Sequence, residues 1–228
     1  MNLSPRLKKI ADFVPINSIV ADIGTDHGYV PKYLIDKGIS KLVIATDISR
    51  GSLQKTIDYI REENLEDQIE ARLGDGLEPI LPFQADTGVI AGMGGLLIVE
   101  ILEKSMAVAK ILNRLILQPM VGSVELRRFL HGAGFQIIDE DLVKEGDKYY
   151  EIIVAKVGLQ KFANEFDYEI SPVLMKKGNP LTKEMVETRL SIHEKIMDTL
   201  RDSPGEKSKA RLVELDKIVR DYREVLER

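Results

Sequence analysis

Between residues 18 and 158 the chain alternates short apolar runs with amphipathic segments, and this alternation restricts the fold more than any other feature. Strand-like runs lie at residues 18–22, 42–46, 69–73, 87–91 and 115–117. Helical periodicity between them predicts helices over residues 30–37, 49–63, 96–109 and 124–131. Because strands that alternate with helices form a parallel sheet covered on both faces, we expect an α/β, Rossmann-like fold.

Two further strand-like runs, residues 135–143 and 149–157, are joined by the turn sequence Glu145-Gly146-Asp147. They predict an antiparallel hairpin that closes the otherwise parallel sheet. By analogy with known folds, such a hairpin is typical of methyltransferases that use S-adenosylmethionine (SAM) rather than of dinucleotide-dependent dehydrogenases. We therefore expect a class I SAM-dependent methyltransferase fold over residues 1–158.

Residues 159–228 have a different character. A connector over residues 159–180 is followed by two charged segments whose apolar residues recur at helical spacing. These residues are Met185, Ile192, Ile196 and Leu200 in the first segment, and Leu212, Leu215, Val219, Tyr222 and Val225 in the second. The turn sequence Asp202-Ser203-Pro204-Gly205 separates the segments. We predict an antiparallel helical hairpin with coiled-coil packing.

Composition narrows the class of protein further. The 228 residues include no cysteine, which excludes disulfides and thiolate sites, and the three histidines are too few for us to expect a metal centre. No apolar run is long enough for a membrane helix or a signal peptide, so we expect no membrane association and a cytoplasmic location. The net charge of −5 argues against indiscriminate nucleic-acid binding. Since no long uncharged apolar face is evident, we expect a monomer.

The loop after the first strand favours a cationic ligand. A dinucleotide fingerprint counted from Gly24 requires glycines at positions 26 and 29, but this chain has Asp26 and Tyr29 there. A carboxylate repels a pyrophosphate, whereas it attracts a sulfonium or an ammonium group. The run Asp22–Gly28 therefore predicts a SAM site. The alternative is a plain strand-to-helix turn in which an aspartate caps the helix.

Three later strands also end in residues suited to a nucleoside ligand. Asp47, 23 positions after Gly24, is placed to accept hydrogen bonds from ribose hydroxyls, unless it is only a solvated strand end. Asp75, in Gly74-Asp75-Gly76, is placed to meet the adenine amino group, although this sequence is also a common turn. Glycines in the run Ala91–Gly95 allow the backbone to approach a ligand, or else serve only tight helix packing. The run lacks the Asn/Asp-Pro-Pro-aromatic tetrad that is frequent in enzymes methylating the adenine amino group.

Together these motifs resemble those of the bacterial tRNA (adenine-22-N1)-methyltransferase family. The resemblance rests on Asp22–Pro31 and Ala91–Gly95, with support from Leu3–Leu7 and Leu117–Pro119, and extends over nearly the whole chain. It implies methyl transfer from SAM to N1 of an adenine in the D-arm region of tRNA. It also implies that the C-terminal helices help to hold the tRNA.

We expect Asp26 to act in catalysis, because N1 methylation leaves positive charge on the base and a carboxylate stabilises that charge or accepts a proton from N6. Tyr29 and Met93 are candidates for the wall that holds the base. His27 either orients the base or cofactor or is structural. The expected cofactor-binding residues are Asp22, Gly24, Thr25, His27, Gly28, Tyr29, Asp47, Ile48, Asp75, Gly76, Ala91, Gly92 and Met93.

For contact with tRNA phosphates we select Arg6, Lys8 and Lys9, which precede the first strand; the alternative is a solvated amphipathic helix. Arg127 and Arg128 are weaker candidates. The tail has equal numbers of basic and acidic side chains, so its charge alone does not indicate RNA. A methyltransferase acting on a small metabolite, and a non-catalytic SAM-binding or coiled-coil protein, remain as alternatives.

Overall fold

The computed structural model describes residues 3–201 and 205–227. The chain divides into two compact units, Met1–Lys161 and Phe162–Arg228, which are treated separately below. The turn predicted at Asp202-Ser203-Pro204 lies outside the described residues.

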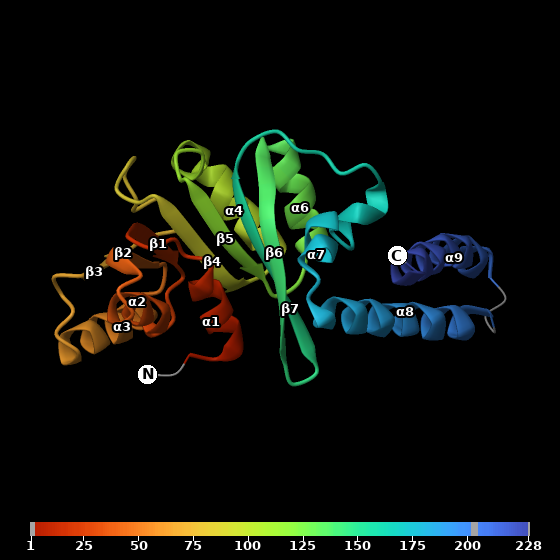
Figure 1. Ribbon diagram of the computed structural model, residues 1–228, viewed down its shortest axis with the longest axis horizontal. Coiled ribbons are helices and arrows are strands. Elements are labelled where there is room, and N and C mark those ends of the chain that lie inside the picture. The colour runs from red at the N-terminus through yellow and green to blue at the C-terminus, as the bar shows by residue number, and fades with distance from the viewer. Residues whose placement is uncertain (1–2, 202–204, 228) are drawn as a thin grey trace. The chain divides into compact units, whose positions relative to one another are not determined.

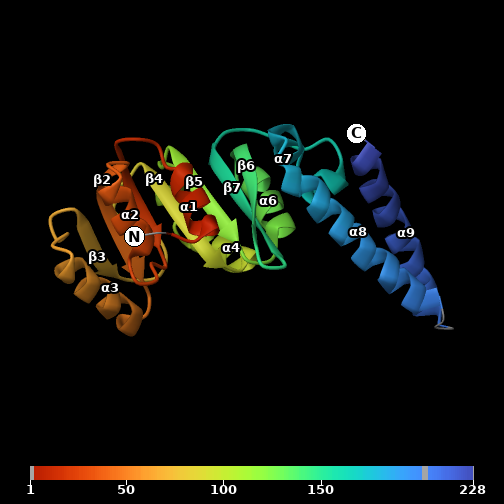
Figure 2. The same cartoon turned by 60° about the horizontal axis from the view of Figure 1, so that its bottom comes forward.

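A single sheet organises the first unit (Figure 1). Its seven strands within the described residues follow the order β3-β2-β1-β4-β5-β7-β6, which can be traced in Figure 2. The strands are β1 (Ser18–Ile23), β2 (Ser40–Asp47), β3 (Ile69–Leu73), β4 (Thr87–Met93), β5 (Arg114–Pro119), β6 (Phe135–Glu145) and β7 (Lys148–Val157). Strands β1 to β5 are parallel, whereas β7 runs antiparallel to both β5 and β6. The predicted Rossmann-like sheet with its closing antiparallel hairpin is confirmed.

Helices cover both faces of this sheet, as the nearly continuous burial of its central strands requires. Val20, Val89 and Ile116 point to one face, where they pack with buried residues of α1 (Pro5–Asp12), α2 (Tyr29–Asp36) and α3 (Arg50–Glu62). Their neighbours Ile90 and Leu117 are equally buried on the other face. In Figure 1 that face carries α4 (Gly95–Lys104) and α6 (Ser123–Gly132).

The helix predicted over residues 96–109 is interrupted. It ends at Lys104, and a short helix, α5 (Met106–Ala109), follows Ser105. Ser105 has φ −120° and ψ 35°, which lies outside the helical region, and it is buried. Apolar periodicity continues through this break, so the sequence pattern alone did not reveal it.

The second unit is helical. The predicted connector contains a 3₁₀ turn, η1 (Glu165–Tyr168), and a short helix, α7 (Pro172–Lys177), followed by the long helices α8 (Pro180–Arg201) and α9 (Glu206–Glu227). Met197 of α8 packs with Leu215 and Val219 of α9, and all three are buried. The predicted pair of helices is therefore present. The apolar face of α8 differs from the predicted one, however, because Ile192 and Ile196 are 50% and 42% exposed.

Candidate active site

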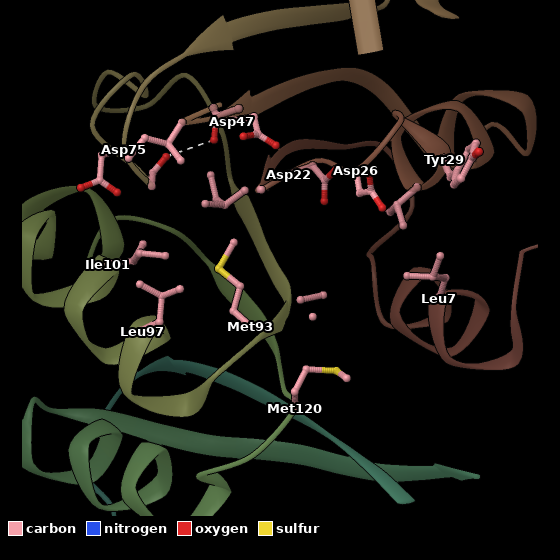
Figure 3. A pocket seen from close by; sticks show the side chains of 18 of the residues that line it. Leu7, Asp22, Asp26, Tyr29, Asp47, Asp75, Met93, Leu97, Ile101 and Met120 are labelled. Atoms are coloured by element: carbon pink, nitrogen blue, oxygen red, sulfur yellow. Dashed lines mark hydrogen bonds between the residues drawn. The ribbon is translucent and has the colours of Figure 1, made fainter. Parts of the chain in front are cut away.

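A cavity of about 510 Å³ lies at the carboxyl ends of the parallel strands, which is where open α/β sheets bind ligands. Figure 3 shows Asp47 and Asp75 at one end, Leu7 and Tyr29 at the other, and Asp22 and Asp26 between them. The lining residues are Arg6, Leu7, Asp22, Ile23, Gly24, Asp26, Tyr29, Val30, Thr46, Asp47, Ile48, Gly74, Asp75, Gly76, Ala91, Gly92, Met93, Leu97, Ile101 and Met120.

Asp22 and Gly24 form the floor of the cavity at the end of β1. Burial raises the pKa of the Asp22 carboxyl from its ordinary 3.8 to about 6, because the ionised form loses hydration there. Gly24 has φ +72°, and a Cβ at this position would lie 2.2 Å from Cε of Met93. The backbone N–H of Gly24 donates to the Thr46 carbonyl at 2.8 Å, which fixes the loop against β2. This position therefore requires glycine for both conformation and space.

Asp26 faces the cavity from the loop, with 80% of its side chain exposed. Its Oδ1 lies 2.5 Å from Nδ1 of His27, and the His27 ring stacks on Tyr29 with the centroids 5.4 Å apart. The structure places Thr25, His27 and Gly28 beside the cavity rather than in its lining. The assignment of these three residues to cofactor binding stays a prediction.

Asp47 ends β2 and Asp75 lies two residues after β3, and both line the same side of the cavity. Oδ1 of Asp47 accepts a hydrogen bond from the Ser49 backbone N–H at 2.7 Å, so this oxygen holds the turn into α3. Oδ2 of Asp75 pairs with Nζ of Lys104 at 2.6 Å. The second oxygen of each carboxylate forms no hydrogen bond with the residues that the structure describes. Ile48 beside them is 68% exposed and offers an apolar surface.

Gly92 in β4 and Gly95 at the start of α4 have different roles. Gly92 lines the cavity and has φ +76°. Gly95 instead packs against the loop after β5, where a Cβ would lie 2.1 Å from the Gly122 carbonyl oxygen. Its N–H donates to Val121 at 2.7 Å. The expectation of backbone close to a ligand therefore fits Gly92, whereas Gly95 serves helix packing.

Arg6 lines the cavity from α1, whereas the two lysines predicted with it do not. Lys8 pairs with Asp12 at 2.9 Å and Lys9 with Asp141 at 3.0 Å. Lys8 is the more accessible of the two, with 55% of its side chain exposed against 34% for Lys9.

The proposal that Arg127 contacts RNA is wrong. Its side chain is fully buried and forms ion pairs with Glu140, at 2.8 Å, and with Glu151. It neutralises carboxylates between α6 and the β6–β7 hairpin and has no access to a partner molecule. Arg128, the next residue, is exposed.

Several cavity residues were not selected from the sequence. Leu97, Ile101 and Met120 line the cavity with Met93 and give this side an apolar surface (Figure 3). Leu97 and Ile101 belong to a helix whose periodicity looks like that of any core-facing helix, so no local signal separated them. Thr46 lies within β2, where the strand pattern does not distinguish it from its neighbours.

Comparison with known proteins shows to which family this chain belongs. A family model described as a methyltransferase domain matches residues 3–153. The tRNA (adenine(22)-N(1))-methyltransferase of Bacillus subtilis is 33% identical over 237 aligned residues, which cover 100% of this chain and 98% of that protein. The chain belongs to the tRNA (adenine-22-N1)-methyltransferase family.

Solved structures of family members share the whole fold. The crystal structure of a putative tRNA (m1A22) methyltransferase from Streptococcus pneumoniae has a TM-score of 0.91 and 33% identity, and covers 99% of this chain and 100% of that one. A second structure of it, in complex with S-adenosyl-L-methionine, has a TM-score of 0.87, 32% identity and coverage of 99% and 100%. The resemblance found in the sequence is thereby confirmed.

None of the helices that the structure describes is both long and apolar enough to cross a membrane. Within residues 3–201 and 205–227, no group of three His, Cys, Asp or Glu side chains is arranged to hold a metal ion.

Proposed function

We propose that this protein transfers a methyl group from SAM to N1 of the adenine at position 22 of tRNA. The observation that carries this proposal is full-length similarity to an enzyme named for that reaction, in a chain whose cavity lies at the expected edge of the sheet. As a family member the chain is a SAM-dependent tRNA methyltransferase. The finer roles of individual residues, given below, are part of the proposal.

The carboxylates of the cavity suit the cationic groups of SAM. Four carboxylates line it, those of Asp22, Asp26, Asp47 and Asp75, and SAM carries a sulfonium and an ammonium group. When bound, SAM supplies the methyl group on a cationic sulfur, from which a base nitrogen takes it by in-line displacement. We assign Asp22 and Asp26 to the cationic end of SAM, and Asp47 and Asp75 to its ribose and adenine.

The protein's contribution to the reaction is mainly to position the two reactants. N1 of neutral adenine already has a lone pair, so the enzyme gains most by holding this atom in line with the methyl group. Met93, Leu97 and Met120 present an apolar surface beside the cavity that suits the face of an unstacked base. Asp26, from the opposite loop, stabilises the charge that appears on the methylated base or accepts a proton from N6.

The decisive experiment maps the product. The full-length protein is incubated with SAM and unmodified tRNA, and the methylated nucleosides are identified and located by mass spectrometry. We expect 1-methyladenosine at position 22. Methyl transfer to a small molecule and not to tRNA supports the metabolite alternative, and SAM binding without any transfer supports a non-catalytic role.

The remaining parts of the proposal concern the oligomeric state, the location and the macromolecular partner of the enzyme. We propose that it acts as a monomer in the cytoplasm, with tRNA as its macromolecular partner. Lys8, exposed on α1, is the preferred candidate for a phosphate contact. The mass of the protein in solution, measured by light scattering with and without tRNA, tests the monomer.

A further inference from the structure

The four aspartates that line the cavity match the cationic groups of SAM but not its anionic group. Besides its two cationic groups, SAM has an α-carboxylate, which the four aspartates would repel. Among the lining residues of the described chain, Arg6 is the only one with a cationic side chain. Lys104 lies near Asp75 but is not part of the lining. One cation is thus available for one anionic group.

Arg6 is held in place by several contacts. Its backbone N–H donates to Oε1 of Glu145 at 2.8 Å, and its Nη1 donates to Oε1 of Gln118 at 2.6 Å. Its guanidinium carbon lies 5.3 Å from the centre of the Tyr150 ring. Only 20% of the side chain is exposed. A cation fixed in this way loses little conformational freedom when it binds an anion.

Gln118 links Arg6 to the end of β4, which contains Gly92. The Gln118 side chain is fully buried, and its Oε1 accepts hydrogen bonds both from Arg6 and from the Gly92 N–H at 3.1 Å. Arg6 Nη1 lies 3.8 Å from the point that a Cβ on Gly92 would occupy. The guanidinium therefore lies directly over the backbone at the end of β4, where Gly92 lines the cavity.

The guanidinium retains donors that no described residue uses. Its Nε is buried without a hydrogen-bond partner, and Oε2 of Glu145 lies 3.9 Å from it, beyond hydrogen-bond distance. Nη2 likewise forms no hydrogen bond within residues 3–201 and 205–227. A buried N–H is costly to leave unsatisfied, so the Nε of Arg6 indicates a ligand rather than a purely structural role.

We infer that Arg6 binds the α-carboxylate of the methyl donor. This inference rests on the proposed function, and it fixes the direction in which SAM lies. The nucleoside end meets Asp47 and Asp75, and the amino-acid end lies near α1, where Figure 3 places Leu7 opposite that pair. The other anion of suitable chemistry is a tRNA phosphate. We favour the carboxylate, because Arg6 is largely buried in the wall of the cavity, whereas Lys8 on the same helix is exposed.

The test combines a variant with a trimmed ligand. Wild type and Arg6→Gln are titrated calorimetrically with SAM and with decarboxylated SAM, which keeps the sulfonium and the ammonium but lacks the carboxylate. We expect Arg6→Gln to weaken SAM binding about 10- to 100-fold, as for loss of a charge-assisted pair. Decarboxylated SAM should bind both proteins with affinities within about threefold of each other. Thermal melting confirms that the variant is folded.

Two further variants show whether the effect of Arg6→Gln is specific to its position and to the shape of its side chain. Arg6→Lys keeps the charge but loses the planar fork, and should give an intermediate loss for SAM alone. Arg61→Gln, an exposed arginine at the end of α3, should bind both ligands as wild type does. An equal loss for both ligands in Arg6→Gln overturns the inference in favour of a structural role.

Unchanged SAM affinity together with a raised KM for tRNA also overturns the inference, and assigns Arg6 to a phosphate. Failure of the wild-type protein to bind SAM at all is a distinct result, because it refutes the proposed function itself. Apart from the KM for tRNA and the melting control, every measurement is one of binding, so the comparison of SAM with decarboxylated SAM does not depend on catalysis.

Discussion

Nδ1 of His27 lies 2.5 Å from Oδ1 of Asp26, so the most exposed carboxylate of the loop after β1 lies against the ring of its neighbour. The His27 backbone has φ +59°, a conformation that non-glycine residues rarely adopt. Its ring stacks on Tyr29, which begins α2. Strained backbone of this kind persists where the surrounding structure holds it in place and is frequent at functional sites. The arrangement directs Asp26 toward the cavity.

The first prediction concerns Asp26. Asp26→Asn should lower kcat about 100-fold, the range expected for loss of a group that stabilises charge or accepts a proton. The melting temperature should change little, because the side chain is 80% exposed. Steady-state kinetics with tRNA and SAM measure the effect. Asp67→Asn, an exposed carboxylate before β3, is the matched control. Wild-type turnover in Asp26→Asn would remove Asp26 from the mechanism.

The second prediction concerns the pH dependence of Asp22. Its pKa is raised from 3.8 to about 6 by burial, so between these values the folded protein holds a proton that the unfolded chain has lost. The free energy of unfolding of the SAM-free protein should therefore fall as pH rises through this window. A shift of about two pH units corresponds to about 3 kcal/mol. Above pH 6 the ionised carboxylate remains as a cost to stability.

Asp22→Asn tests this cost directly. The variant should raise the melting temperature of the SAM-free protein at pH 7.5, and the gain should shrink toward pH 4. SAM affinity should fall in the same variant, because the negative charge facing the donor is lost. In the wild type, SAM should bind more weakly below about pH 6 as Asp22 takes up a proton. A stability gain that is the same at both pH values would contradict this account.

The third prediction separates two roles of Asp47. Asp47→Ala should weaken SAM binding about 10-fold or more through loss of charge-assisted hydrogen bonds to the ribose. It also removes the acceptor of the Ser49 N–H. Asp47→Asn keeps an oxygen for that N–H but lacks the charge. If the ribose role is correct, calorimetry will show a loss in both variants; unchanged SAM affinity in Asp47→Asn refutes a charged contact.

Site residues could be predicted from the sequence where a local sequence pattern marks them. Strand ends are marked locally by runs such as Asp22–Gly28 and by Asp47, and parallel strands bring these ends to one edge. The cavity therefore includes most of the predicted residues. Met120 was missed, because its contribution depends on how the segment after β5 pairs with the end of β4: Met120 N–H donates to the Met93 carbonyl at 2.7 Å. Such a pairing leaves no pattern in either segment alone.

Charged residues were the least predictable. A basic side chain next to a strand or helix looks the same whether it faces solvent, a ligand or a buried carboxylate. Arg127 and Arg128 are adjacent in sequence and differ completely in burial, because successive residues of a helix point in different directions. Arg6 was predicted at a phosphate and lies in the cavity lining. The positions of Arg127 and Arg6 become clear only from their partners, which distant segments supply: Glu140 and Glu151 for Arg127, and Gln118 for Arg6.

The fourth prediction follows from the burial of Arg127. Arg127→Met leaves the carboxylates of Glu140 and Glu151 buried near each other without their cation. Breaking such a group costs about 3–5 kcal/mol, so the melting temperature should fall by roughly 10 °C. Arg128→Met, one residue further along and exposed, should change it by no more than about 2 °C. Similar melting temperatures for the two variants would show that the buried pairs contribute little.

The last prediction concerns the helical unit. All residues that line the cavity lie at or before Met120, so removing Phe162–Arg228 should leave SAM affinity within about threefold of wild type. If the helices hold tRNA, the KM for tRNA should rise about 10-fold or more. The KM should also depend less steeply on salt, because phosphate contacts release counterions when they form. Kinetics at several salt concentrations measure both effects. A shortened protein that differs from wild type only in thermal stability would assign α8 and α9 a structural role.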